Sequence, residues 1–197
     1  MDKIIYINLD KRTDRRNQIE QDLAEFGLLQ NTERFPAIPH PNGCVGCGYS
    51  HLSVLQLAQS NGWKNVLILE DDFHFVVTKK FFDNFIETII QQPFDVVMLG
   101  YHDENVVEME PYNEICNRVL ESSNACGYLV NSHYYSALID LFAIYLPMLE
   151  KTGQHWNYAN DVLWKRLQKL DLWLLANPKI GKQRSGYSDN SNTYVEY

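Results

Sequence analysis

The strongest constraint on the fold is a strand-length apolar run at residues 65–69 that stops abruptly at three acids. An uninterrupted apolar run of this length is typical of a central strand that is covered on both faces. Glu70, Asp71 and Asp72 then come at the carboxyl edge of the sheet, where open α/β sheets bind their ligands. The run therefore predicts an α/β protein with a polar site at the end of this strand.

The start of the chain has the same organisation. Residues 3–9 have the pattern of a buried strand, and Thr13 resembles the N-cap of a helix that carries Ile19 and Leu23 on one face. Gly27 marks the end of that helix. The chain is expected to begin with a strand, a short basic loop and a helix.

Apolar runs and helical periodicity continue to alternate further along the chain. The ranges that fit strands are about 34–38, 95–99 and 126–130, and those that fit helices are about 47–62, 78–92, 132–142 and 160–170. Residues 101–114 are acidic and lack periodicity, which indicates loops. This alternation predicts a Rossmann-like α/β/α sandwich with a mainly parallel central sheet.

Length and composition indicate one domain. A chain of 197 residues that is 45% hydrophobic is expected to form a single domain, residues 1–197, with a substantial core. We find no internal repeat and no convincing domain boundary. Residues 177–197 are rich in small and polar residues without periodicity, so they are expected to form a C-terminal lid or tail.

The charge pattern bears on partners and location. A formal charge of −8, from 17 Lys and Arg against 25 Asp and Glu, argues against nucleic-acid binding, because cations that neutralise phosphates supply that affinity. Arg12, Arg15 and Arg16 are a local exception that fits one small anion. The N-terminal apolar run is too short for a signal sequence, and no segment approaches the roughly 20 apolar residues of a membrane span. A cytoplasmic location is therefore expected.

The cysteines allow two interpretations. Cys44 and Cys47 have the spacing of zinc ligands, but Cys116 and Cys126 do not repeat that spacing. The missing second pair favours ordinary reduced cysteines. A zinc or redox module on the first pair stays open beside that interpretation.

The acidic triplet itself points to a cation. Adjacent carboxylates repel one another unless a positive charge offsets them. Mg²⁺ and Mn²⁺ bind through one or two carboxylates and complete their shell with water and substrate phosphates. The alternative is that the acids merely end a strand at the surface.

Four short segments spread over nearly the entire chain carry a family resemblance. They are residues 6–16 (YINLDKRTDRR), 46–51 (GCGYSH), 66–72 (VLILEDD) and 183–189 (QRSGYSD). In order and spacing they resemble glycosyltransferase family 25, the lipooligosaccharide and procollagen β-galactosyltransferases. The resemblance implies a GT-A-type fold, a UDP-sugar donor, a divalent metal (usually Mn²⁺) and inversion at the anomeric carbon.

Carried over by position, Glu70-Asp71-Asp72 is similar to the family's DxD-equivalent motif. The resemblance implies that Asp72, at a solvent-facing strand end, binds the metal directly. It implies that Asp71 contacts the ribose or a metal-bound water. Glu70, nearest the buried strand, is expected to have a structural role at the donor site.

The opening strand and loop resemble the donor-binding edge of the family. Asn8 and Leu9 are expected beside the uridine, with Arg12 or Arg15 facing the diphosphate, because guanidinium groups match phosphate oxygens. The alternative is a helix start with exposed charges, in which Asp14 in the first turn favours the helix dipole.

Two further motifs match the family. Ser50 and His51 fit its Gly-Cys-x-x-Ser-His motif, whose helix is expected against the sheet near the donor, and their expected role is positional. Asp161 matches a late acidic position and is the expected base for the acceptor hydroxyl, since an inverting transfer needs one. The alternative for Asp161 is an acid that the start of a helix stabilises.

The closing stretch, residues 178–189, resembles the segment that folds back across the donor in this family. Gln183 and Ser188 are expected to contact the donor, and Asp189 is expected to join the metal shell. Trp156 and Tyr158 are expected to line the acceptor site, although aromatics at helical spacing are more often core.

The resemblance implies a hexosyltransferase that moves galactose or glucose from a UDP-hexose to a hydroxyl of a glycan or glycosylated protein, as in lipopolysaccharide biosynthesis. A catalytically silent nucleotide-sugar-binding or glycan-binding domain with the same fold is the alternative.

Overall fold

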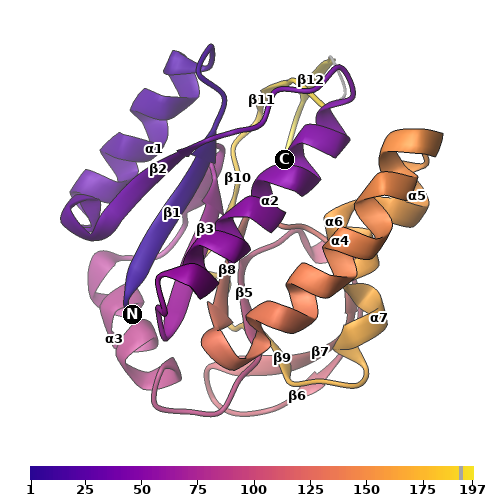
Figure 1. Cartoon of the computed structure of the whole chain (residues 1–197). Coiled ribbons are helices and arrows are strands. Elements are labelled where there is room, and N and C mark those ends of the chain that lie inside the picture. Colours follow the sequence, from indigo (N-terminus) through magenta and orange to yellow (C-terminus); the bar gives the residue numbers. More distant parts are fainter. Residues whose placement is uncertain (191–192) are drawn as a thin grey trace.

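The computed structural model of the chain describes residues 1–190 and 193–197, and its centre is a β-sheet flanked by helices (Figure 1). The strand order is β2-β1-β3-β8-β5-β9-β7-β6, and β10 pairs with both β4 and β5 beside this path. The strands are β1 (Lys3–Asn8), β2 (Thr32–Pro36), β3 (Asn65–Glu70), β4 (Phe73–Phe75), β5 (Val96–Gly100), β6 (Val106–Pro111), β7 (Cys116–Ser122), β8 (Gly127–Asn131), β9 (Trp173–Ala176), β10 (Gly181–Gln183), β11 (Gly186–Ser188) and β12 (Thr193–Val195). The helices are α1 (Thr13–Glu25), α2 (Gly43–Ser60), α3 (Lys79–Ile89), α4 (Tyr135–Thr152), α5 (His155–Tyr158), α6 (Asn160–Leu163) and α7 (Lys165–Gln168), with 3₁₀ turns at Leu29–Asn31, Asp103–Asn105 and Ser132–Tyr134.

The centre of the sheet is largely parallel. β1 pairs in parallel with β2 and β3, β5 pairs in parallel with β9, and β8 runs antiparallel between β3 and β5. β1 and β3 therefore end at the same edge, at Asn8 and Glu70. This confirms the expected α/β/α sandwich with a mainly parallel sheet.

Each face of the sheet has its own helices, because successive side chains of a strand point to opposite faces. Ile5 and Ile68 belong to the buried cluster that includes α2 and α4. Ile4 and Leu69 belong to the cluster that includes α1 and α3. Figure 1 shows these two pairs of helices on opposite sides of the strands. β1 and β3 are thus covered on both faces, as their uninterrupted apolar runs predict.

Helix caps set several of these boundaries. The side chain of Thr78 caps α3 as predicted, since its Oγ1 accepts a hydrogen bond from Phe81 N at 3.3 Å. α2 begins at Gly43, earlier than predicted, because the side chain of Asn42 caps it through Cys44 N. Among residues 1–190 and 193–197, no helix combines the length and apolarity that crossing a bilayer requires.

Parts of the second half of the chain depart from their predicted elements, although the strand and helix predicted at residues 126–130 and 132–142 are present as β8 and α4. The expected loop at residues 101–114 contains β6, which pairs with β7 in an antiparallel hairpin. Five of the six residues of β6 are exposed, so the strand has no apolar pattern to read. The hydrogen bonds to β7 hold β6 in an extended conformation that the sequence of β6 alone does not indicate.

The helix predicted at residues 160–170 is broken into α6 and α7. Trp164 separates them, and its indole N–H donates to Ser122 O of β7 at 3.2 Å. The Gln168 side chain exchanges two more hydrogen bonds with the Ser122 backbone, at 2.8 and 3.0 Å. These buried contacts fix the path, and Leu170 is 78% exposed instead of continuing an apolar stripe.

The predicted lid or tail, residues 177–197, folds back over the sheet, and residues 191–192 of that range lie outside the described residues. β10 pairs with β4 and β5, and β11 pairs with β12 in a separate hairpin. Gly181 permits the close approach, because a Cβ there would lie 2.2 Å from the Phe73 ring and 2.8 Å from His74 O. The C-terminal segment is thus built onto the sheet next to the acidic triplet.

Candidate functional site

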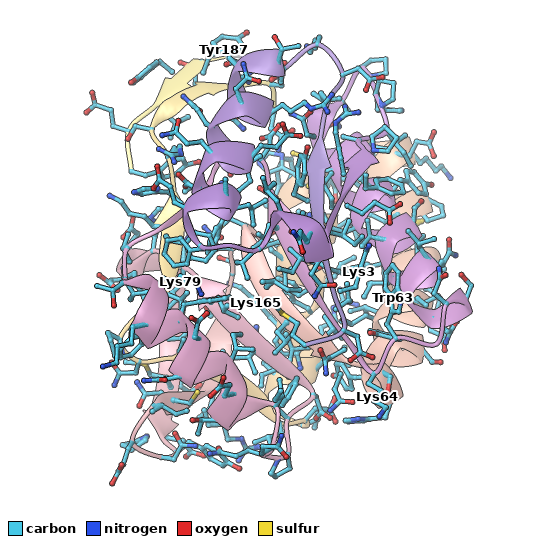
Figure 2. The ribbon with its side chains drawn as sticks, turned by 90° about the vertical axis from the view of Figure 1, so that its left-hand side faces the viewer. Lys3, Trp63, Lys64, Lys79, Lys165 and Tyr187 are labelled. Atoms are coloured by element: carbon cyan, nitrogen blue, oxygen red, sulfur yellow. The ribbon has the colours of Figure 1, made fainter. Side chains whose placement is uncertain are left out.

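A cavity of about 510 Å³ lies at the carboxyl edge of the sheet, beside the ends of β1 and β3 and the C-terminal segment. This volume is within the range of roughly 300–1,000 Å³ that small-ligand sites occupy. In Figure 2, Tyr187 of β11 marks this end of the molecule, and Lys64, just before β3, lies at the other end. The predicted site residues on the cavity wall are Leu9, Arg15, His51, Glu70, Asp71, Asp72, Gln183, Ser188 and Asp189.

Asp71 is held by side chains from β1 and α1. Its Oδ2 accepts a hydrogen bond from Asn8 Nδ2 at 2.7 Å, and its Oδ1 accepts one from Arg15 Nη1 at 2.9 Å. Asn8 is only 1% exposed. Arg34 fixes its side chain, because Arg34 Nε donates a hydrogen bond to Asn8 Oδ1 at 3.0 Å. Asn8 therefore lies beneath the cavity and positions Asp71, and it is not part of the wall beside which the uridine was expected.

Asp72 is buried, so the expectation that it lies at a solvent-facing strand end is wrong. The C-terminal segment packs over it, and Arg184 N donates a hydrogen bond to Asp72 O at 2.7 Å. Its carboxylate Oδ2 accepts hydrogen bonds from Arg15 Nη1 at 2.9 Å and from Gln183 Nε2 at 3.5 Å. The other oxygen, Oδ1, is buried without a hydrogen-bond partner among residues 1–190 and 193–197. Burial, together with the neighbouring charge of Glu70, raises the pKa of Asp72 to about 7.

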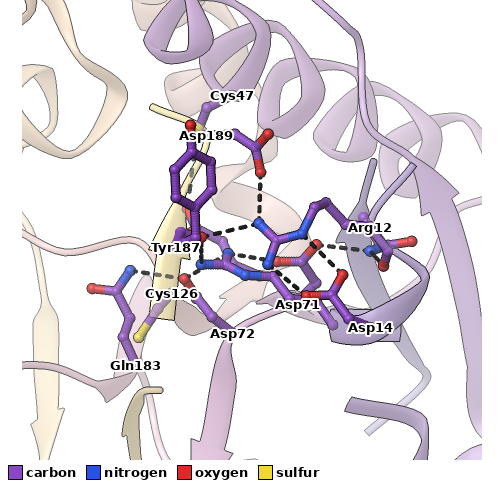
Figure 3. A network of polar contacts seen from close by, with 12 residues as sticks. Arg12, Asp14, Cys47, Asp71, Asp72, Cys126, Gln183, Tyr187 and Asp189 are labelled. Atoms are coloured by element: carbon purple, nitrogen blue, oxygen red, sulfur yellow. Dashed lines mark hydrogen bonds and ion pairs between the residues drawn. The ribbon is translucent and has the colours of Figure 1, made fainter. Parts of the chain in front are cut away.

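Two arginines contact the C-terminal segment, and one of them, Arg15, also holds Asp71 and Asp72. Figure 3 shows Arg12 beside Asp14 and Asp189. Arg15 Nη2 and Arg12 Nη1 both donate to the carbonyl oxygen of Tyr187 at 3.0 Å. Arg12 also pairs with Asp14 through two hydrogen bonds of 3.0 and 2.8 Å. Arg15 lies on the cavity wall and Arg12 does not, so the structure separates the two candidates for the diphosphate contact.

Asp189 connects the C-terminal segment to the basic loop after β1. Its Oδ2 accepts a hydrogen bond from Arg12 Nη1 at 2.6 Å, and its Oδ1 lies 2.6 Å from Lys11 Nζ. Both oxygens of this predicted metal ligand are therefore engaged by cations. The contacts hold the segment over the cavity.

Glu70 faces α2, away from the arginines that hold its neighbours. Its Oε1 lies 3.2 Å from His51 Nε2 and 3.7 Å from Cys47 Sγ, and His51 Nδ1 lies 2.8 Å from the Tyr128 hydroxyl. Burial raises the pKa of Glu70, but the hydrogen bonds and the charges around it outweigh burial, so the net shift is downward. Glu70 is on the cavity wall with 23% of its side chain exposed.

Ser50 positions the helix and not a ligand. It is fully buried, donates from Oγ to Gly46 O at 2.6 Å and accepts from Ile38 N at 2.8 Å. Ile38 is part of the wall, so Ser50 joins α2 to the loop that borders the cavity. This arrangement fits the positional role expected for Ser50.

Asp161, the expected base, lies in the first turn of α6 and is not on the wall of this cavity. Its Oδ2 accepts a hydrogen bond from Asn124 N at 3.0 Å. The Asn124 side chain in turn donates to Gln183 Oε1 at 2.8 Å, which connects Asp161 to the wall. Burial raises the pKa of Asp161 despite the bond from Asn124.

A scan against protein-family models gives no match, and a search of curated proteins gives none. Among solved structures, the chain is similar to a glycosyltransferase involved in the glycosylation of the major capsid of PBCV-1, with 11% identity, a TM-score of 0.60 and coverage of 96% of this chain and 95% of that chain. It is also similar to a mannose-1-phosphate geranyltransferase from Thermus thermophilus, with 10% identity, a TM-score of 0.53 and coverage of 89% of this chain and 74% of that chain.

The fold is of the GT-A type. At these identities the likeness shows the fold and not the activity. The predicted Rossmann-like GT-A sandwich is confirmed, and membership of glycosyltransferase family 25 stays a prediction.

Several residues of the cavity wall were missed from the sequence. Lys11, His40 and Tyr197 line the cavity without any role assigned to them from the sequence, and Cys47, considered there only as a possible zinc ligand, lines it as well. Asn124 is a further omission: its φ of 97° is left-handed, a conformation that Asn tolerates better than most residues. That tolerance was the signal available, but its meaning depends on the contacts with Asp161 and Gln183.

The expected aromatic acceptor platform is absent from the cavity wall. Neither Trp156 nor Tyr158 lines it. Tyr158 stacks on Tyr145 with ring centroids 6.3 Å apart, and Trp156 is 62% exposed on α5. α5 packs against α4, and the expectation that these two side chains line the acceptor site stays a prediction.

Proposed function

We propose that this chain is a metal-dependent inverting glycosyltransferase that transfers a hexose from a UDP-sugar to a hydroxyl of a glycan or glycosylated protein. The observation that carries the proposal is the acidic triplet in the cavity at the carboxyl edge of a GT-A-type sheet, with Asp72 Oδ1 buried and unpartnered among the described residues. Such an oxygen costs free energy unless a ligand compensates it.

A hard divalent cation, Mn²⁺ or Mg²⁺, fits this donor set. Asp72 would hold it through the oxygen that accepts no hydrogen bond. Asp189 of the same wall is the second proposed ligand, and it would exchange a contact with Lys11 or Arg12 for the ion. When bound, such an ion stabilises the negative charge of the departing diphosphate as a Lewis acid.

The protein's own residues have separate proposed roles toward the donor. Arg15 is assigned to the diphosphate, because its guanidinium lies on the wall beside the carboxylates. Asp71, held by Asn8, is assigned to the ribose or to a metal-bound water. Leu9, Gln183 and Ser188 complete the wall around the donor.

Asp161 is proposed as the base that takes the proton of the acceptor hydroxyl. The raised pKa of its carboxyl favours this role, since a base works best when its pKa is near the operating pH. Its place outside the wall of the donor cavity is compatible with a group that acts on the acceptor.

Donor turnover tests the proposal as a whole. The protein is incubated with Mn²⁺ and a panel of UDP-hexoses, with and without a pool of glycan acceptors, and released UDP is measured. We expect metal-dependent UDP release from one donor that stops when a chelator removes the metal. UDP binding without turnover of any donor would favour the catalytically silent binding domain, and absence of both would overturn the proposal.

Asp161→Asn separates the base from the donor site. We expect unchanged UDP affinity in the presence of Mn²⁺ and a transfer rate lower by about 10²–10⁴-fold, the usual contribution of general base catalysis. Calorimetry and initial rates measure the two quantities. Loss of UDP affinity equal to the loss of rate would instead assign Asp161 to positioning of Asn124 and Gln183.

A further inference from the structure

A second group of ligand atoms lies in the same cavity, outside the proposed donor chemistry. Cys47 and His51 are one helical turn apart on α2, and Glu70 ends β3 beside them. Cys47 Sγ, His51 Nε2 and Glu70 Oε1 all lie within 4.8 Å of one another, and all three residues line the cavity. A thiol and an imidazole are softer ligands than the carboxylates that a sugar-nucleotide enzyme uses for Mn²⁺.

Two of the three separations among these atoms match the edges of a tetrahedral zinc site. With bonds of about 2.3 Å to sulfur and about 2.0 Å to nitrogen and oxygen, tetrahedral angles place N and O about 3.3 Å apart and S and O about 3.5 Å apart. The observed separations are 3.2 Å from His51 Nε2 to Glu70 Oε1 and 3.7 Å from Cys47 Sγ to Glu70 Oε1. Glu70 is thus close to its metal-bound spacing from both partners before any ion enters, while the ligand atoms of Cys47 and His51 lie within 4.8 Å of each other.

The surroundings of His51 also fit a metal ligand. Its Nδ1 lies 2.8 Å from the hydroxyl of Tyr128, and both residues are fully buried. Histidines that bind a metal donate their other ring N–H to an oxygen, which fixes the ring and its tautomer. The Tyr128 oxygen is in place to accept that proton when Nε2 is free to bind.

We infer that Cys47, His51 and Glu70 form a binding site for a soft transition-metal ion, Zn²⁺ first, with its fourth position facing the cavity. Binding replaces the thiol proton of Cys47 by a metal–sulfur bond and releases that proton to solvent, while the His51 ring proton moves from Nε2 to Nδ1. Cys44, the zinc partner that the sequence spacing suggests, is not in the cluster formed by the described residues.

Cobalt provides the direct test, because thiolate ligation gives Co²⁺ a charge-transfer absorption that oxygen ligands do not. The full chain is titrated with Co²⁺ under reducing conditions, alongside Cys47→Ser and Cys44→Ser. Cys44 is the matched control, a partly buried cysteine on the same helix that is outside the cluster. We expect one equivalent of Co²⁺ with a thiolate band in the wild type and in Cys44→Ser, displaced by Zn²⁺.

In Cys47→Ser we expect the thiolate band to disappear and zinc affinity to fall by about 10-fold or more. Absence of the band in the wild type would overturn the inference and leave these three side chains as a hydrogen-bonded cluster. Equal loss of the band in Cys44→Ser would overturn the assignment of the ligands.

Asp72→Asn distinguishes this site from the proposed donor site. The zinc inference does not depend on the proposed function, so we expect the variant to keep the cobalt–thiolate band while Mn²⁺-dependent UDP binding is lost. Loss of the band in Asp72→Asn would mean that the thiolate-bound ion also needs Asp72, and it would overturn the inference of a site separate from the carboxylates, whatever the outcome of the donor assay.

Discussion

Two regions of one cavity wall stabilise their acidic side chains with different partners. Asp71 and Asp72 share the guanidinium of Arg15, with N–O distances of 2.9 Å to each. Glu70 is held instead by an imidazole and a thiol from α2. The pKa of Asp72 is raised chiefly by burial, whereas that of Glu70 is lowered. Consecutive residues thus have opposite electrostatic environments.

The strand geometry explains this difference. Side chains of consecutive residues in a strand point to opposite faces, so the end of β3 directs Glu70 toward α2 and Asp71 toward β1 and α1. The carboxylate region, defined as Asp71, Asp72 and Arg15, offers hard oxygen ligands. The mixed region, defined as Cys47, His51 and Glu70, offers sulfur and nitrogen as well. One acidic triplet therefore contributes to two kinds of site.

The largest expected effect is on UDP affinity and comes from a substitution in the carboxylate region alone. Asp72→Asn removes the charge of the proposed metal ligand while keeping its shape, so we expect Mn²⁺-dependent UDP affinity to fall by at least about 100-fold. Calorimetry with UDP and Mn²⁺ measures this, and circular dichroism checks the fold. Asp83→Asn on α3, where Asp83 pairs with Lys79, is the control. Unchanged affinity in Asp72→Asn would remove the metal assignment.

Arg15→Gln tests charge compensation in the carboxylate region. The variant leaves two largely buried carboxylates without their shared cation, and we expect it to lower the free energy of unfolding by about 2–3 kcal/mol. Because a divalent ion can replace that charge, Mn²⁺ should raise the melting temperature of the variant more than that of the wild type. Equal metal-induced shifts in both proteins would contradict this account of the region.

Asn8→Ala probes the support beneath the carboxylate region. Asp71 loses its 2.7 Å hydrogen bond from Asn8, so we expect UDP affinity with Mn²⁺ to fall by about tenfold. Removing a residue that supports a metal ligand typically has an effect of this size. Asn61→Ala, at an exposed asparagine that ends α2, should leave the affinity unchanged. A loss as large as that of Asp72→Asn would mean that Asn8 maintains the fold of the whole region.

The smallest expected effect is the electrostatic coupling between ions bound in the two regions. Zn²⁺ bound in the mixed region adds positive charge near the carboxylates, so we expect it to weaken Mn²⁺-dependent UDP binding severalfold in the wild type and in Cys44→Ser. In Cys47→Ser the zinc effect should disappear. Competition calorimetry measures it, and an identical zinc effect in all three proteins would place the ion in the carboxylate region.

The sequence carried the information for the first half of the fold. The apolar runs at residues 3–9 and 65–69 specified buried strands, and Thr78 specified a helix start. These patterns are local, because a period of side-chain burial depends only on neighbouring residues and on the element they form. The position of the acidic triplet at the sheet edge followed from the same reasoning.

The tertiary structure decided which side chains meet around that triplet. Asn8 reaches Asp71 across 63 positions, and Arg12 reaches Asp189 across 177 positions. Cys47 lies beside Glu70 and not in a cluster with Cys44, and β6 forms only by pairing with β7. No periodicity encodes such contacts, since they arise when sheet register and helix packing bring distant segments together. The sequence by itself determined the strands and the charges at their ends; the fold determined their partners.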